Sequence, residues 1–194
     1  MIKNVLPSLL AAAVQGFDLR VIKQSLMNFI PGPEHTPGRM NIFKYRHCDV
    51  MVDYAHNADG FRELHQFMQQ IDSPDKIGII GCPGDRRDED LIEMGFLAGK
   101  SFDRLIIRFD KDGRGRSNSS IQELLKEGIE NANPQAEIRV IADEVNAIDQ
   151  AMKMADHGGF IVVCSEDYQR CIDHLQAKGH QIRKHKHSDY QMTG

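Results

Sequence analysis

The amino-acid sequence predicts an α/β protein with a doubly wound, mostly parallel sheet, preceded by a short helical segment. Strand-like and helix-like segments alternate five times along most of the chain, which is the rhythm of such sheets. The runs at 76–82 and 160–164 are almost entirely apolar, as in strands covered on both faces. Because crossovers between parallel strands are right-handed, the loops that follow the strands are expected to meet at one edge of the sheet.

Residues 1–30 carry the pattern of two short helices. Apolar residues recur at helical spacing on both sides of Gly16, which is a suitable helix stop. Two short helices cannot enclose a core by themselves, so we interpret this segment as the end of a domain that begins before it. Residues 31–38 follow with three prolines and two glycines, a composition that suits a linker or hinge.

The rest of the chain supplies the strands and helices of the sheet. Residues 41–46 and 49–53 predict a hairpin of two strands around His47. Further strands are expected at 76–82, 103–109, 137–142 and 160–164. Helices are expected at 60–71, 91–101, 117–129, 144–154 and 168–175.

We therefore expect three parts: the helical segment with its linker at 1–38, the α/β domain at 39–180, and a disordered basic tail at 181–194. His180, His185 and His187 lie in or near this tail. A charged chain end is favoured there over a zinc site, because zinc needs its ligands closed into a defined geometry.

Composition excludes several classes of function. The 194 residues are 41% hydrophobic and 27% charged, which is ordinary for a globular protein. A net charge of −4 provides no general attraction to nucleic acid or to an anionic membrane. No apolar run is long enough to span a bilayer, and the start does not resemble a signal peptide, so a cytoplasmic location is expected.

The four cysteines are not arranged as Cys-x-x-Cys and fall on or beside predicted strands and helices. Buried free thiols are favoured over a disulfide or metal role, as expected in a reducing compartment. They are Cys48, Cys82, Cys164 and Cys171.

The stretch from Val50 to Gly60 joins a strand to a helix through the polar residues Asp53, His56 and Asn57. In an open parallel sheet such a junction lies where ligands bind, and the free N–H groups of the next helix favour anions. Asp, Asn and His are equally common in turns and at helix N-caps. The local pattern alone leaves both interpretations open.

Three segments carry a family resemblance. Residues 53–57, Asp-Tyr-Ala-His-Asn, resemble the nucleotide-binding signature of the C-terminal, Rossmann-like domain of the Mur ligase superfamily. Residues 36–41 resemble its interdomain linker, and residues 81–90 resemble the loop after its next strand. The form of residues 84–90, followed by residues 109–116, is most similar to the cyanophycin synthetases within that superfamily.

The resemblance implies a part of an enzyme that uses ATP and Mg²⁺ to activate a carboxylate, which an amine then attacks. It implies that Arg39 contacts the ATP phosphates, that Asp53 accepts from the ribose hydroxyls, and that His56 and Asn57 line the edge of the nucleotide. A solvated charge in the linker is the ordinary alternative for Arg39. A guanidinium is suited to bidentate contact with phosphate.

The resemblance further implies that an amino-acid or peptide substrate is received by the next loops. Carboxylates there would bind a guanidinium, and arginines would hold carboxylates, although a solvated rim explains about half of these charges equally well. The candidate substrate-binding residues are Asp85, Arg86, Arg87, Asp90, Asp110, Lys111, Asp112, Arg114, Ser165 and Glu166.

One departure from the family pattern is Ala58, where many members have proline. More importantly, the sequence contains no Gly-x-x-x-x-Gly-Lys-Ser/Thr loop, and we expect no catalytic residue and no metal site within this chain. The implied partners are the remaining domains of a parent ligase, and homo-oligomer formation is left open. The alternatives are a lobe of a peptidoglycan-type or folate-type Mur ligase, and a non-catalytic nucleotide-binding or scaffolding domain.

Overall fold

The computed structural model describes residues 2–45, 47–179 and 181–182, which fall into two units. The first contains the helices α1 (Ile2–Val14) and α2 (Leu19–Asn28), with the break between them at the predicted Gly16. Asp18 starts α2, because its carboxylate accepts the N–H of Arg20 at 2.7 Å. Both helices leave large apolar side chains exposed: Leu6, Leu10, Val14, Leu19, Val21 and Met27.

The second unit begins at Gly32 and contains a seven-stranded sheet with the order β5-β4-β3-β6-β2-β1-β7. Strands β2 to β6 are parallel to one another, whereas β1 is antiparallel to both β2 and β7. The strands are β1 (Asn41–Tyr45), β2 (Cys48–Asp53), β3 (Lys76–Ile80), β4 (Arg104–Ile107), β5 (Glu137–Val140), β6 (Gly159–Cys164) and β7 (Gln181–Ile182). The predicted doubly wound, mostly parallel sheet is confirmed.

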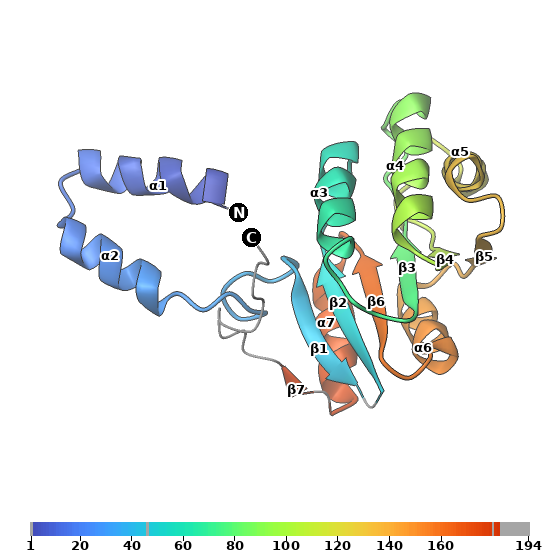
Figure 1. Ribbon diagram of the computed structural model, residues 1–194. Coiled ribbons are helices and arrows are strands. Elements are labelled where there is room, and N and C mark those ends of the chain that lie inside the picture. The colour runs from blue at the N-terminus through green and yellow to red at the C-terminus, as the bar shows by residue number, and fades with distance from the viewer. Residues whose placement is uncertain (1, 46, 180, 183–194) are drawn as a thin grey trace. The chain divides into compact units, whose positions relative to one another are not determined.

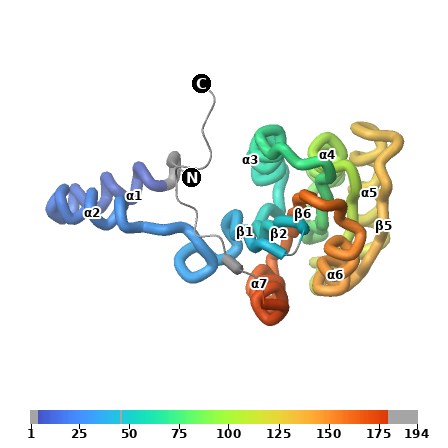
Figure 2. The backbone as a smooth tube through the Cα atoms, turned by 60° about the horizontal axis from the view of Figure 1, so that its bottom comes forward, coloured from blue at the N-terminus to red at the C-terminus, as the bar shows by residue number. Residues whose placement is uncertain are grey.

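Two layers of helices cover the sheet (Figure 1). One face carries α3 (Ala58–Met68), α4 (Asp88–Ser101) and α5 (Asn118–Ala132), and the other carries α6 (Glu144–Met154) and α7 (Tyr168–Ala177). Figure 2 shows the same two layers from another direction.

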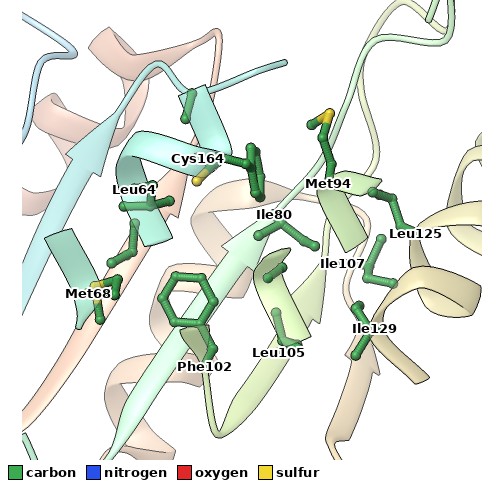
Figure 3. Packing of buried hydrophobic residues seen from close by; sticks show 14 of the residues in the cluster. Leu64, Met68, Ile80, Met94, Phe102, Leu105, Ile107, Leu125, Ile129 and Cys164 are labelled. Carbon is green, nitrogen blue, oxygen red and sulfur yellow. The ribbon is translucent and has the colours of Figure 1, made fainter. Parts of the chain in front are cut away.

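The side chains of β6 point alternately to the two faces of the sheet, so this one strand packs against both layers of helices. Phe160, Val162 and Cys164 belong to the cluster under α3, α4 and α5, whereas Ile161 and Val163 belong to the cluster under α6 and α7. All five side chains are buried, which accounts for the continuous apolar run in the sequence. Figure 3 shows the first cluster, in which Ile80, Leu105 and Ile107 of the sheet face side chains of the helices.

Two glycines allow α4 and α5 to pack closely. A Cβ atom on Gly95 would lie 2.1 Å from the carbonyl oxygen of Leu125, and one on Gly128 would lie 2.0 Å from that of Ile92. Backbone therefore meets backbone at this helix contact.

Two helices begin earlier than the hydrophobic pattern predicted. Helix α3 begins at Ala58, because the side chain of Asn57 accepts the N–H of Gly60 at 2.8 Å and caps the first turn. Helix α4 begins at Asp88, and its first turn consists of three acidic residues, which stabilise the positive end of the helix dipole. The predicted helix starts relied on the spacing of large apolar residues, and the first turns of α3 and α4 contain none.

The four cysteines are free and buried, as predicted. Two residues of the predicted tail, Gln181–Ile182, form β7 beside β1. His180, His185 and His187 lie outside the residues that the structure describes. Within the described ranges, no helix is long and apolar enough to cross a membrane.

Candidate functional site

The carboxyl ends of the parallel strands meet at one edge of the sheet, as the alternation predicted. The N–H of Ser165, after β6, donates to the carbonyl of Asp53 at the end of β2, at 3.0 Å. The N–H of Arg108, after β4, donates to the carbonyl of Ile80 at the end of β3, at 2.8 Å. Since β3 also pairs with β6, the loops after these four strands lie at the same edge.

The segment from Thr36 to Met40 is fastened to this edge. The amide of Asn41 is buried; its Oδ1 accepts the N–H of Gly38 at 2.7 Å, and its Nδ2 donates to the carbonyls of Thr36 and Arg39 at 3.0 and 3.3 Å. The N–H of Met40 donates to Asp53 Oδ2 at 2.9 Å. The predicted linker thus ends in a segment with a fixed backbone.

Arg39 emerges from this segment beside an open recess of about 390 Å³, which is lined by Pro37, Arg39, Tyr54, Glu166 and Tyr168. The guanidinium carbon of Arg39 lies 5.2 Å from the centroid of the Tyr54 ring, which is a cation–π contact. The ring of Tyr168 meets the Tyr54 ring edge-on at 5.9 Å. The recess therefore offers a cation, a carboxylate and two aromatic rings.

Asp53 lies at the end of β2, and both of its carboxylate oxygens accept backbone N–H groups. Oδ2 accepts from Met40 and Oδ1 from Ala55, each at 2.9 Å. Burial raises the pKa of the Asp53 carboxyl, and this effect outweighs the two hydrogen bonds and the charge of Arg39, which act in the opposite direction. A carboxylate oxygen has two lone pairs, so each can still accept from a ligand hydroxyl.

His56 and Asn57 follow directly. His56 Nδ1 lies 2.9 Å from the carbonyl of Tyr54; since a carbonyl only accepts, Nδ1 carries the hydrogen and the other ring nitrogen can accept when the imidazole is neutral. The His56 ring packs against the Tyr54 ring with 4.6 Å between centroids. The side-chain oxygen of Asn57 caps α3, so the local alternative for Asn57 holds in this structure.

Arg114 links three of the loops. Its Nη1 lies 3.0 Å from Asp85 Oδ2 in the loop after β3, and its Nη2 lies 3.1 Å from Glu166 Oε2 in the loop after β6. Asp112 fixes the Arg114 backbone, because its carboxylate accepts the Arg114 N–H at 2.9 Å. Since Glu166 also lines the recess beside Arg39, the two groups of predicted residues form one continuous surface.

The other charged candidates lie around this cluster. Arg86 Nε is 4.0 Å from Asp85, and the Lys111 ammonium contacts Asp167. The carboxylate of Asp110 accepts the N–H of Asp112 at 3.1 Å and helps to shape the loop. Arg87 and Asp90 form a bidentate pair with each other on the first turn of α4, with distances of 3.0 and 2.8 Å. Within the described residues, this pair makes no hydrogen bond or ion pair with Arg114.

Sequence reasoning did not identify Arg108. Its buried side chain supports the site by bonding to the backbone at the end of β6. Its guanidinium is buried, and Nε donates to the carbonyl of Cys164 at 3.0 Å, while Nη1 lies 3.6 Å from Asp110 Oδ2. A Cβ on Gly81 would lie 2.9 Å from the Arg108 side chain, so glycine leaves the space that Arg108 fills. The available signal in the sequence was a charged residue directly after an apolar strand, with a glycine directly after the preceding strand.

The side chain of Ser165 is not placed to contact a ligand. Its side chain is only 1% exposed, and its hydroxyl donates to Glu144 Oε2 at 2.8 Å while accepting the N–H of Asp167 at 3.1 Å. Glu144 is itself buried and receives Arg170 at 3.1 Å. Ser165 therefore braces the loop that presents Glu166.

The contact between Arg114 and Asp85 is expected to make the stability of the fold depend on pH. The hydrogen bond from Arg114, with the positive charges of Arg114 and Arg86, holds the pKa of the Asp85 carboxyl below its usual value. A lowered folded-state pKa stabilises the fold above the ordinary aspartate pKa of about 4, and this contribution is lost as the pH falls through the lowered value.

We expect Arg114→Gln to raise the pKa of Asp85 toward the ordinary value in an NMR titration of its side-chain carboxyl. The pKa of the Asp143 carboxyl, which the N–H of Asn146 and the guanidinium of Arg170 lower, should stay as in the wild type, because neither partner is replaced. An Asp85 titration curve identical to that of the wild type would contradict the predicted coupling.

The chain matches the family model for the Mur ligase, glutamate ligase domain, over residues 38–166. It is 41% identical over 176 residues to the cyanophycin synthetase of Geminocystis herdmanii, covering 91% of this chain and 20% of that protein. It is 32% identical over 174 residues to a UDP-N-acetylmuramoyl-L-alanyl-D-glutamate--2,6-diaminopimelate ligase of Clostridium botulinum, covering 87% of this chain and 34% of that protein. The chain thus spans only a part of the length of these relatives.

Two solved structures share the fold. That of a UDP-N-acetylmuramoyl-L-alanyl-D-glutamate--2,6-diaminopimelate ligase matches with a TM-score of 0.60 and 22% identity, covering 93% of this chain and 39% of that one. Escherichia coli FolC in complex with ADP matches with a TM-score of 0.58 and 19% identity, covering 74% of this chain and 32% of that one. The resemblance inferred from residues 53–57 and its flanking motifs is confirmed, and the chain belongs to the Mur ligase family through its glutamate ligase domain.

Proposed function

We propose that the chain is the C-terminal lobe of an ATP-dependent carboxylate–amine ligase similar to cyanophycin synthetase, and that it contributes to the binding of ATP and of the amine acceptor. The observation that carries the proposal is the shared surface of Arg39, Glu166 and Arg114. A cation beside an aromatic ring at one end is continuous with a cluster of paired charges at the other. Such a surface can hold a nucleotide and a charged amino acid side by side.

The nucleotide is proposed to lie at the end formed by Arg39. The guanidinium is suited to the phosphates, Tyr54 and His56 offer ring surfaces to the rest of the nucleotide, and Asp53 can accept from ribose hydroxyls. Asn57 acts at this end through the first turn of α3, whose free N–H groups favour an anion. FolC, which binds ADP, has the same fold.

The amine acceptor is proposed to lie at the other end. Asp85 and Glu166 already hold the guanidinium of Arg114, so their spacing suits a guanidinium or ammonium group of a substrate. Arg86 and Arg114 can bind a carboxylate of the same substrate. Asp110, Lys111 and Asp112 shape the loop, and Ser165 holds Glu166 in place.

Bound Mg²⁺ would neutralise phosphate charge during phosphoryl transfer. Within the described residues, no group of three His, Cys, Asp or Glu side chains could hold a metal ion by itself. Mg²⁺ in nucleotide sites is usually held by one or two carboxylates, water and the phosphates, and we propose that the protein ligands come from other domains of the parent protein. The exposed apolar side chains of α1 and α2 are proposed to pack against those domains, since the chain spans 20% of a cyanophycin synthetase.

The proposal predicts that the 194-residue chain alone releases no phosphate from ATP, whereas the full-length ligase that contains it does. In the full-length ligase, Asp53→Ala should weaken ATP binding by about tenfold or more, the usual effect of removing a hydrogen bond to a charged group. It should also reduce the preference for ATP over 2′-deoxy-ATP.

Phosphate release and isothermal titration calorimetry provide the two measurements. Asp72→Ala is the matched control, because this exposed aspartate precedes β3 and lies at the opposite end of that strand from the loops of the site. Steady phosphate release by the pure 194-residue chain would contradict the proposal that turnover needs the other domains of the ligase. Unchanged ATP binding by Asp53→Ala would contradict the proposed nucleotide site.

The identity to a diaminopimelate ligase favours a second candidate, a lobe of a peptidoglycan-type ligase. Acceptor specificity separates the two candidates. A ligase of the cyanophycin type should turn over with an Asp/Arg peptide and its free amino acids, whereas a peptidoglycan-type ligase requires a nucleotide-linked sugar peptide.

A further inference from the structure

We infer that Asn41 and Asp53 are positioning residues for Arg39, because their side chains clamp the backbone on either side of it. The inference rests on the proposed function, in which Arg39 contacts the nucleotide phosphates. It goes beyond that function by assigning Asn41 a role and by giving Asp53 a role that does not involve the ribose.

The clamp holds the residues before and after Arg39. On one side, the N–H of Gly38 donates to Asn41 Oδ1 at 2.7 Å, and the carbonyl of Gly38 accepts the N–H of Tyr54 at 2.8 Å. On the other side, the N–H of Met40 donates to Asp53 Oδ2 at 2.9 Å. The carbonyl of Arg39 itself accepts from Asn41 Nδ2 at 3.3 Å. The backbone of Arg39 is thus fixed on both sides, while its side chain remains available.

The clamp also holds an unfavourable backbone conformation. Met40 has a φ of 49°, in the left-handed region that a side chain such as methionine disfavours. Gly38 has a φ of 69°, and a Cβ there would lie 2.6 Å from the ring of Tyr168. A chain with these angles on both sides of Arg39 persists only if surrounding contacts favour it, and Asn41 and Asp53 supply those contacts.

Asn41 and Asp53 take part in the sheet through their backbones, which leaves their side chains available for other contacts. Asn41 and Val52 are already partners in the antiparallel pairing of β1 and β2, and Asp53 and Cys164 are partners in the pairing of β2 and β6. All three hydrogen bonds of the buried Asn41 amide go to residues 36–39. The side chains of the two residues therefore hold the segment around Arg39, while their backbones belong to the sheet.

A double-mutant cycle in the full-length ligase tests the inference, with ATP and inorganic tripolyphosphate as probes. If Asp53 acts through Arg39, Asp53→Ala weakens tripolyphosphate binding by about tenfold in the wild-type background but by less than about twofold in the Arg39→Ala background. With ATP the effect of Asp53→Ala should be smaller in the Arg39→Ala background than in the wild type, and the part that remains is the ribose contact. A ribose contact alone would leave tripolyphosphate binding unchanged. Equal effects of Asp53→Ala in both backgrounds, with either probe, would overturn the inference.

Hydrogen exchange of the 194-residue chain provides a readout that does not depend on nucleotide. The amide of Met40 should exchange at least about tenfold faster in Asp53→Ala, and the amide of Gly38 should do so in Asn41→Ala. Asn41→Asp is the second variant at that position, because it keeps an acceptor for Gly38 and loses the two donated bonds. In this variant the exchange of Gly38 should stay within about twofold of the wild type. Asp59→Ala should leave both amides unchanged.

The two experiments separate the two claims. If wild-type ligase binds neither probe while the amide exchange responds as expected, the proposed function fails and the clamp stands. If nucleotide binds but exchange at Gly38 and Met40 is the same in all variants, the clamp is wrong and the nucleotide site stands.

Discussion

Replacing Arg39 by alanine is expected to weaken ATP binding by the full-length ligase by about 10-fold to 100-fold, the largest functional effect that we predict for a single side chain. The expected loss follows from removing charge-assisted hydrogen bonds to phosphate, each worth about 1.5–3 kcal/mol. Arg39→Lys should recover only a part of the affinity, because an ammonium keeps the charge but cannot form the bidentate contact. Isothermal titration calorimetry with ATP and a non-hydrolysable analogue measures both.

Arg62→Ala serves as the control for this substitution. Arg62 lies on α3, is half-exposed, and pairs with Asp59 and Glu93, so its removal takes away one positive charge without affecting the recess. An ATP affinity of Arg39→Ala that equals that of Arg62→Ala would show that Arg39 makes no contact with the nucleotide.

The largest effect on stability is expected for Gly128→Ala, which should lower the free energy of unfolding by about 3 kcal/mol or more. The new methyl group would lie 2.0 Å from the carbonyl oxygen of Ile92 and 2.7 Å from the amide nitrogen of Phe96, so α5 must move away from α4. Both atoms belong to the backbone of a helix, and neither can rotate away as a side chain would. Moving the helices apart also opens space among Leu91, Met94 and Leu125 in the core.

Thermal unfolding monitored by circular dichroism should show the loss as a fall in melting temperature of about 6–12 °C, since 1 kcal/mol corresponds to roughly 2–4 °C in a chain of this size. Gly32→Ala is the matched control, because a Cβ there meets no atom within 4 Å. If both variants have the melting temperature of the wild type, the close approach of α4 and α5 that the structure indicates is wrong.

The sequence was sufficient to predict strands β1 to β6 and the helices, because local periodicity indicates both, whereas β7 lies in the predicted tail. The apolar run that became β6 has five neighbouring side chains buried on alternate faces, and no other secondary structure in the predicted topology accommodates it. The turn around Asn57 was recognised as well, although its capping role and its proposed site role could not be separated, because both use the same side chain.

The supporting residues of the site could not be predicted in the same way. Arg108 contacts the carbonyl of Cys164, 56 positions away in the chain, and Glu144 receives Ser165 across 21 positions. Asn41 was interpreted as the first residue of a strand and as the end of the segment that resembles the linker. The role of its amide was not predicted, because the backbone angles that require it are a property of the folded segment. Such contacts depend on which loops the topology brings together, which local patterns do not contain.

The burial of the four cysteines has a chemical consequence. Burial raises the pKa of each thiol, to about 11 for Cys48 and to about 12 for Cys82 and Cys171, and it raises that of Cys164 as well. Peroxides and alkylating reagents attack the thiolate, and here that species is both scarce and shielded from solvent. As long as the sheet stays folded, we expect these thiols to react far more slowly with peroxides and alkylating reagents than an exposed cysteine does.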